Sequence, residues 1–166
     1  EPVARSAPAV VNVQTTKCIA TSRLIMPADP MIRRFFEQMP GFNQQQKTTS
    51  LGSGVLVSER GYILTNLHVI DGADEIQVAL NDGRQSSAKV VGIDADTDLA
   101  VLQITLKDLP TIEFSLKESP RVGDVVLAIG NPFGVGQTVT SGIVSALGRD
   151  HVGINTFENF IQTDAA

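Results

Sequence analysis

Short, β-branched apolar segments separated by turn sequences recur along this 166-residue chain. Residues 75–80 alternate polar and apolar side chains, as a strand with one buried face does. This segment ends at Asn81-Asp82-Gly83, three residue types that tolerate the positive φ of a tight turn. Similar segments cover residues 10–15, 54–58, 62–65, 88–93, 99–104, 125–129, 138–147 and 157–163. Strands at spacings of about 8–12 residues predict an all-β sandwich or barrel.

Composition and charge exclude several classes of protein. With 42% apolar and 19% charged residues, the chain is typical of ordered globular proteins. Its 18 acidic and 13 basic side chains give a net charge of −5, so we expect no basic face for a nucleic acid. No apolar stretch approaches the roughly 20 residues of a membrane span, so membrane attachment would need an anchor outside this sequence. The single cysteine, Cys18, excludes an internal disulfide and a multi-cysteine metal site.

A long polar insertion over residues 21–49 interrupts the β pattern. Within it, Asp29-Pro30 is a good helix start and Pro40-Gly41 a good helix stop, which predicts a short helix over 31–39. Ile32, Phe35, Phe36 and Met39 fall on one face of this helix. That face either packs on the chain's own barrel or is presented to a neighbouring subunit or a substrate.

Two local patterns resemble ligand-binding loops but lack residues that those loops need. Residues 130–138 are rich in glycine, but no Gly-Lys-Ser/Thr ends them, so a phosphate-binding loop is excluded. Residues 94–98 place aspartates at the first, third and fifth positions of a calcium loop. The required glycine and glutamate at its sixth and twelfth positions are replaced by Leu99 and Thr105. The sequence therefore predicts no metal ion and no cofactor.

His68 and Asp98 are the residues most suggestive of chemistry. His68 follows the predicted strand 62–65, and Asp98 precedes the predicted strand 99–104. Separately, each is more often structural than catalytic. Together, in an all-β chain, they reproduce the order histidine, aspartate, serine of trypsin-like proteases. In that chemistry the histidine takes a proton from a serine hydroxyl, while a buried aspartate fixes its tautomer and stabilises the imidazolium.

Five segments carry a specific resemblance to one protein family. They are Thr65-Asn66-Leu67-His68-Val69-Ile70 and residues 96–102, 127–134, 136–146 and 160–166. In the same order and over essentially the whole chain, they resemble the HtrA/Deg family of bacterial envelope proteases. The resemblance implies that His68 is the general base and Asp98 its orienting partner. It also implies that residues 149–159 form a sensor loop in which Arg149 helps to transmit activation.

The nucleophilic serine of the family has no counterpart in these residues. By resemblance it is expected just after Ala166, in a Gly-Asn-Ser-Gly-Gly segment. Ser53 and Ser141 are flanked by glycine, but neither stands in a Gly-x-Ser-x-Gly turn, and both match family positions within strands. We therefore expect the sequence to hold a base and its orienter, and to be inactive alone.

The resemblance also gives a fold and an assembly. It implies two trypsin-like antiparallel β-barrels, with an N-terminal segment and first strand over 1–20, a first barrel over 8–108 and an incomplete second barrel over 109–166. It implies a periplasmic serine endopeptidase that acts on polypeptides, assembles as a homotrimer, and belongs to the DegS/AlgW-like or the DegQ-like branch. A non-catalytic module that uses the barrel only for binding or assembly is the alternative.

Overall fold

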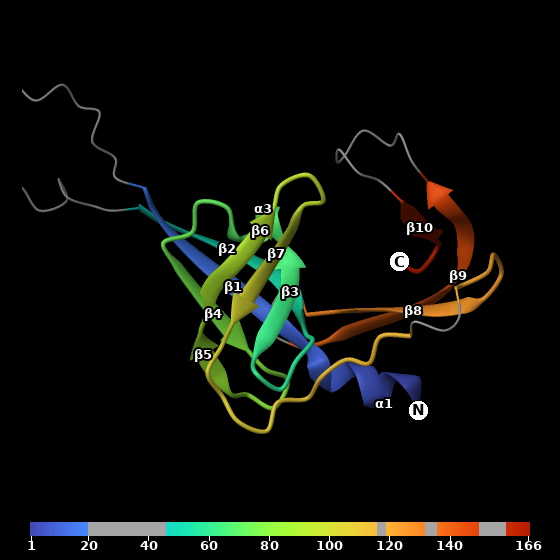
Figure 1. Ribbon diagram of the computed structural model, residues 1–166, viewed down its shortest axis with the longest axis horizontal. Coiled ribbons are helices and arrows are strands. Elements are labelled where there is room, and N and C mark those ends of the chain that lie inside the picture. The colour runs from blue at the N-terminus through green and yellow to red at the C-terminus, as the bar shows by residue number, and fades with distance from the viewer. Residues whose placement is uncertain (20–45, 116–118, 132–135, 150–158) are drawn as a thin grey trace, which may run out of the picture.

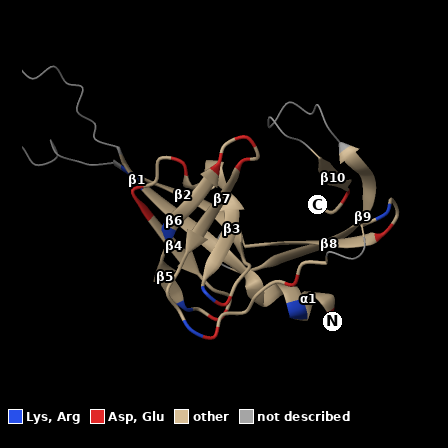
Figure 2. Ribbon diagram, viewed as in Figure 1, with Lys and Arg blue, Asp and Glu red and all other residues tan. Residues whose placement is uncertain are grey.

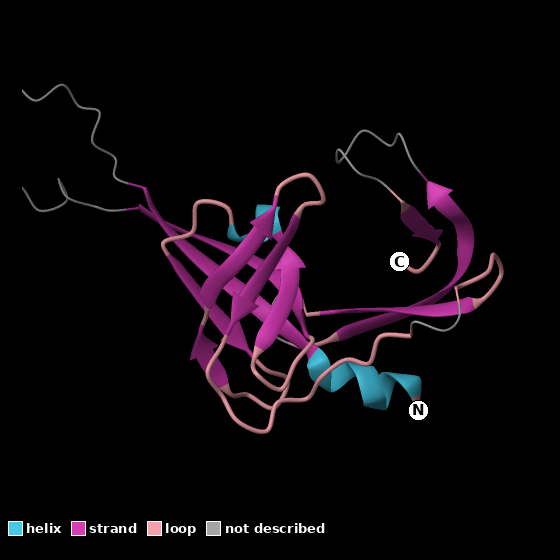
Figure 3. Cartoon of the chain, viewed as in Figure 1, coloured by secondary structure: helices cyan, strands magenta, loops and turns pink. Residues whose placement is uncertain are grey.

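The computed structural model describes residues 1–19, 46–115, 119–131, 136–149 and 159–166. The described strands form one seven-stranded and one three-stranded antiparallel sheet, which confirms the all-β prediction (Figures 1 and 3). The predicted helix over 31–39 and most of the predicted loop over 21–49 lie outside the described residues. None of the helices in the described ranges has the length and apolar character of a membrane span.

The larger sheet is built from residues 10–103. Its strands are β1 (Val10–Ile19), β2 (Gln46–Leu56), β3 (Tyr62–Asn66), β4 (Glu75–Ala79), β5 (Gln85–Ser87), β6 (Lys89–Asp94) and β7 (Leu99–Gln103). They lie in the order β5-β4-β1-β2-β3-β7-β6. A single helical turn, α3 (Leu67–Ile70), follows β3.

The two outer strands of this sheet, β5 and β6, are consecutive in the chain, so the sheet curls until its ends are joined by a single residue. Only Ala88 separates β5, which pairs with β4, from β6, which pairs with β7. The Ala88 N–H donates to the Ile76 carbonyl at 2.9 Å, which continues the pairing with β4 to the point where the chain bends away. β5 and β6 remain the two outer strands of the curled sheet, and every residue of β6 is exposed.

Alternation along the strands supplies the barrel core. In β4, β3 and β7 every second residue is buried, as the polar and apolar alternation of 75–80 predicts. The largest fully buried side chains of this barrel are Val11, Val13, Leu56, Ile63, Val78, Leu102 and Ile104.

The smaller sheet consists of β8 (Val125–Gly130), β9 (Thr138–Arg149) and β10 (Phe160–Thr163), with β9 in the centre. Its strands carry few charged residues, whereas the loops of both sheets carry many (Figure 2). Among its described side chains only Val144 is fully buried. An apolar hollow of about 900 Å³ separates it from the barrel, with Val10, Val55, Leu64, Ile112, Phe114, Val125, Leu127 and Ile129 among its lining residues.

Three short elements differ from the sequence prediction. Residues 2–9 form α1 (Pro2–Ser6) and a 3₁₀ turn, η1 (Ala7–Ala9), because Pro2 and Pro8 fix helical φ values at the first turns. The strand β5 was missed because Gln85-Ser86-Ser87 is polar throughout and has no alternation. β2 begins at Gln46, inside the predicted loop over 21–49, because residues 46–49 extend the pairing with β1.

Gly142, in the middle of β9, allows the chain after β10 to approach closely. A Cβ at this position would overlap the Ala165 nitrogen and Asp164 Oδ1. Asp164 Oδ1 accepts the Ile143 N–H at 2.7 Å, so the overlap also falls on this hydrogen bond. We expect Gly142→Ala to lower the local unfolding free energy of β9 and β10 by about 1–3 kcal/mol, measured by amide hydrogen exchange.

The matched control for this substitution is Gly92→Ala. A Cβ on Gly92, in β6, meets no atom within 4 Å, and neither glycine has a positive φ. Gly92→Ala should change the stability by less than about 0.5 kcal/mol. Equal effects of the two substitutions would show that the close approach at Gly142 is unimportant.

Candidate functional site

The register between β3 and β7 brings His68 and Asp98 together across thirty residues of sequence. Asn66, the last residue of β3, pairs with Leu99, the first residue of β7. Leu67, which follows β3, and Asp98, which precedes β7, therefore lie side by side at this end of the sheet. There the Leu67 N–H donates to the Asp98 carbonyl at 3.0 Å, and α3 begins.

Three further hydrogen bonds hold Asp98 against the start of α3. The Asn66 side-chain amide donates to the Asp98 carbonyl at 3.1 Å. The His68 backbone N–H donates to Asp98 Oδ1 at 2.9 Å, and His68 Nδ1 lies 2.5 Å from Asp98 Oδ2. Both carboxylate oxygens are thus directed at His68. Asp98 adopts a φ of 56°, a left-handed conformation that aspartate tolerates better than most residues.

These contacts keep Asp98 charged. The hydrogen bond from the His68 ring, and then that from the His68 backbone N–H, hold the pKa of the Asp98 carboxyl below its usual range, while partial burial opposes them. The carboxylate is therefore ionised at neutral pH. Since an ionised carboxylate can only accept hydrogen bonds, the proton between the two side chains belongs to His68 Nδ1.

The remaining ring nitrogen of His68 is available for chemistry. With the proton on Nδ1, Nε2 carries a lone pair that can accept a proton from a hydroxyl group. The His68 side chain is 72% exposed, whereas that of Asp98 is 21% exposed. The pair thus leaves the His68 ring open to solvent, while the Asp98 carboxylate is mostly covered.

The other aspartates of this region do not take part in the pair. Asp94 Oδ1 accepts the Asp96 backbone N–H at 3.1 Å, a bond within the turn that precedes β7. No group of three histidine, cysteine or acidic side chains that could hold a metal ion occurs in the described ranges.

Neither glycine-flanked serine is placed as a nucleophile. Ser53 lies in β2, and its Oγ accepts the Asn131 N–H at 2.9 Å. Ser141 lies in β9, opposite Leu127 of β8. No hydrogen bond joins either serine to His68 in the described part of the chain.

Arg149 is the last residue of β9 and pairs with Phe160 of β10. Residues 150–158, which make up most of the expected sensor loop, lie outside the described residues. The role of Arg149 stays a prediction.

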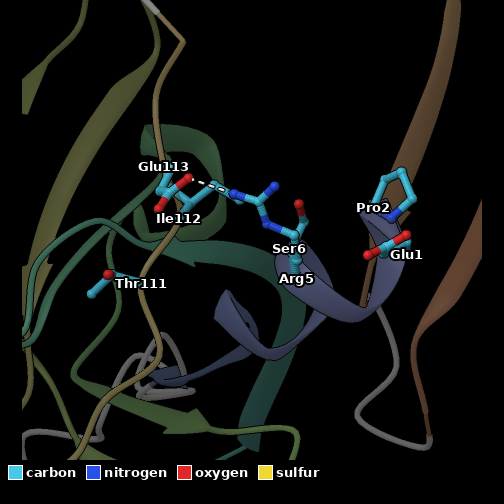
Figure 4. A pocket seen from close by; sticks show the side chains of 7 residues that line it. All are labelled: Glu1, Pro2, Arg5, Ser6, Thr111, Ile112 and Glu113. Carbon is cyan, nitrogen blue, oxygen red and sulfur yellow. Dashed lines mark hydrogen bonds and ion pairs between the residues drawn. The ribbon is translucent and has the colours of Figure 1, made fainter.

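A pocket of about 540 Å³ beside α1 lies apart from this pair. Figure 4 shows its lining residues, Glu1, Pro2, Arg5, Ser6, Thr111, Ile112 and Glu113. Arg5 and Glu113 form an ion pair at 2.7 Å, but their side chains are 72% and 82% exposed, so the pair contributes little to stability. Because neither His68 nor Asp98 is among the residues that line this pocket, the pocket is not the candidate site.

Comparison with known proteins identifies the family. Residues 52–166 match the model of the trypsin-like peptidase domain. The chain belongs to the trypsin-like peptidase family. Within this family it is 47% identical to the serine endoprotease DegS of Salmonella typhimurium, over 99% of this chain and 41% of that protein.

Further trypsin-like peptidases agree with this placement. The chain is 55% identical to the periplasmic serine endoprotease DegP of Salmonella typhimurium, over 74% of this chain and 26% of that protein. It superposes on a structure of the HtrA-type protease AlgW with a decapeptide at a TM-score of 0.77 and 55% identity, covering 98% of this chain and 50% of that one. These matches confirm the HtrA/Deg resemblance and the trypsin-like fold, and the DegS/AlgW-like branch fits. The chain spans less than half the length of these curated relatives.

Two features around the site could not be found from sequence motifs. Asn66 binds the Asp98 carbonyl, but an asparagine before a helix is usually expected only to cap it. Asn12 is buried in β1, between Val11 and Val13, and its side-chain amide donates to the Asn131 carbonyl. An asparagine between two valines was the available signal that a buried hydrogen-bond partner exists.

Proposed function

We propose that this chain supplies the general base and the orienting carboxylate of a periplasmic serine endopeptidase of the HtrA/Deg type. The 2.5 Å contact between His68 Nδ1 and Asp98 Oδ2 carries the proposal, because it leaves Nε2 free to accept a proton. The nucleophile is proposed to be a serine in the segment that follows position 166 in a longer protein. The periplasmic location rests on relatives that are named periplasmic serine endoproteases.

Polypeptides are the proposed substrates. The related protease AlgW has been solved with a tripeptide and with a decapeptide. The family resemblance adds cleavage beside small apolar residues, protein quality control or regulated proteolysis in the envelope, an activating role for Arg149, and a homotrimer.

The proposal is tested by incubating the longer protein with an unfolded polypeptide and identifying the cleavage sites by mass spectrometry. We expect cleavage beside small apolar residues, and none with the His68→Ala variant. A protein that binds the polypeptide without cleaving it would instead support the non-catalytic binding module.

A further inference from the structure

The connection between β8 and β9 is bonded to the barrel at its first residue, Asn131. The Asn131 N–H donates to Ser53 Oγ of β2 at 2.9 Å. The Asn131 carbonyl accepts the side-chain amide of Asn12 of β1 at 2.7 Å, and the same amide lies 3.3 Å from the Gly52 carbonyl. Asn12 is 3% and Asn131 5% exposed, so water does not replace these bonds easily.

The far end of the same connection is bonded to the same part of the barrel. The Gln137 side-chain amide donates to the Val10 carbonyl at 3.1 Å and also to the Ala7 carbonyl. Gln137 directly precedes β9, just as Asn131 directly follows β8. The β8–β9 connection is therefore attached at both ends to the segment around the start of β1.

Ser53, which accepts the Asn131 N–H, also supports β3, the strand that leads into His68. The Ser53 carbonyl accepts the Thr65 hydroxyl at 2.9 Å, and Thr65 stands three residues before His68 in β3. Next to Ser53, Gly52 packs so closely on Val69 of α3 that a Cβ would lie 2.6 Å from its side chain. Ser53 thus binds the residue that follows β8 through its hydroxyl, and binds β3, which leads into His68, through its carbonyl.

We propose that Ser53 and Asn12 are positioning residues, which hold Asn131, at the end of β8, in a fixed place against the barrel strands that support the His68 segment. This inference rests on the proposed function, in which residues after β10 must meet a base carried by the barrel. Barrel and smaller sheet are joined by few other bonds among the described residues. The geometry therefore assigns to these two side chains, together with Gln137, the alignment of the smaller sheet against the barrel.

The first test follows amide hydrogen exchange in the 166-residue chain. Ser53→Ala removes the acceptor of the buried Asn131 N–H, and Asn12→Ala removes the donor to the Asn131 carbonyl. Each should accelerate exchange at residues 125–131 and 138–144 about tenfold, the loss expected for one buried hydrogen bond. Exchange at Ile63, Val78 and Leu102 of the barrel core should change less than about twofold.

Two matched variants keep the bonds and should behave as the unsubstituted chain. Ser53→Thr retains a hydroxyl. Asn131→Ala retains the backbone N–H and carbonyl that make both bonds, and Asn131 Oδ1 has no hydrogen-bond partner in the described part of the chain. Unchanged exchange in Ser53→Ala, or acceleration spread equally over the barrel core, would overturn the positioning role.

The second test measures kinetics in the longer protein. Ser53→Ala should lower kcat about tenfold with KM within about twofold, and Ser53→Thr should restore kcat, because misalignment affects the reacting groups more than substrate binding. Accelerated exchange with an unchanged kcat would overturn the role in catalysis. An unsubstituted protein without any activity would overturn the proposed function instead, and the exchange result would still decide whether the two side chains hold the connection.

Discussion

Replacing His68 by alanine in the longer protein should lower kcat by about four orders of magnitude or more, because the substitution removes the proposed acceptor of the nucleophile's proton. Asp98→Asn should have a loss of similar size for a different reason. An asparagine amide donates to His68 Nδ1 and so moves the ring proton to Nε2, the nitrogen that must accept. Asparagine also tolerates the left-handed φ of this position, so the fold should be kept. Steady-state kinetics on a peptide substrate measure both losses.

The controls for this prediction are Asp94→Asn and Asp96→Asn. These carboxyl groups stand in the same turn region, but no described contact joins either of them to His68. Each substitution should change kcat less than about tenfold, since effects on the base would be indirect. Equal losses at all three aspartates would contradict the His68–Asp98 pair and favour a charge cluster or a metal site.

Residues 1–166 alone should show no peptide hydrolysis above the background of the buffer. A histidine and an aspartate can move a proton, but acyl transfer of the serine type needs a nucleophile that forms a covalent intermediate. Neither glycine-flanked serine is placed to supply one: Ser53 Oγ accepts a hydrogen bond from the Asn131 N–H, and Ser141 lies in β9, within the smaller sheet. Hydrolysis assays with the purified 166-residue chain measure this, with its His68→Ala variant as the control.

Turnover that disappears in that control would contradict the assignment. It would show that His68 works with a nucleophile inside residues 1–166. Turnover that is equal in both chains would come from a contaminating protease and would be removed by further purification.

The chemistry-bearing pair could be predicted from the sequence because each partner lies at a strand end within a recognisable segment. Alternation of polar and apolar residues predicts β4, whereas β3 and β7 follow from apolar segments bounded by turn sequences, and in all three strands every second residue is buried. The sequence could not show the register of Asn66 on Leu99, which makes thirty residues of separation a direct contact. Register depends on pairing across the whole barrel and not on any local pattern.

The hydrogen bonds between the larger sheet and the β8–β9 connection could not be predicted either, because they also depend on tertiary structure and not on a local pattern. Asn131 lies in a segment rich in glycine and proline that is typical of a loop, and nothing local indicates that Ser53 and Asn12 receive it. The passage of the chain from β5 to β6 through Ala88 joins the two ends of the larger sheet and likewise has no local sequence signal. Such features arise from tertiary packing, which overrides local propensity.

The central claim is that His68, oriented by Asp98, activates a serine beyond position 166. The most direct measurement is the reaction of the longer protein with a serine-directed phosphonate, followed by mapping of the labelled residue by mass spectrometry. The account predicts one labelled serine after position 166 and no labelling of the His68→Ala variant. Labelling of Ser53 or Ser141, or labelling that persists without His68, would contradict it.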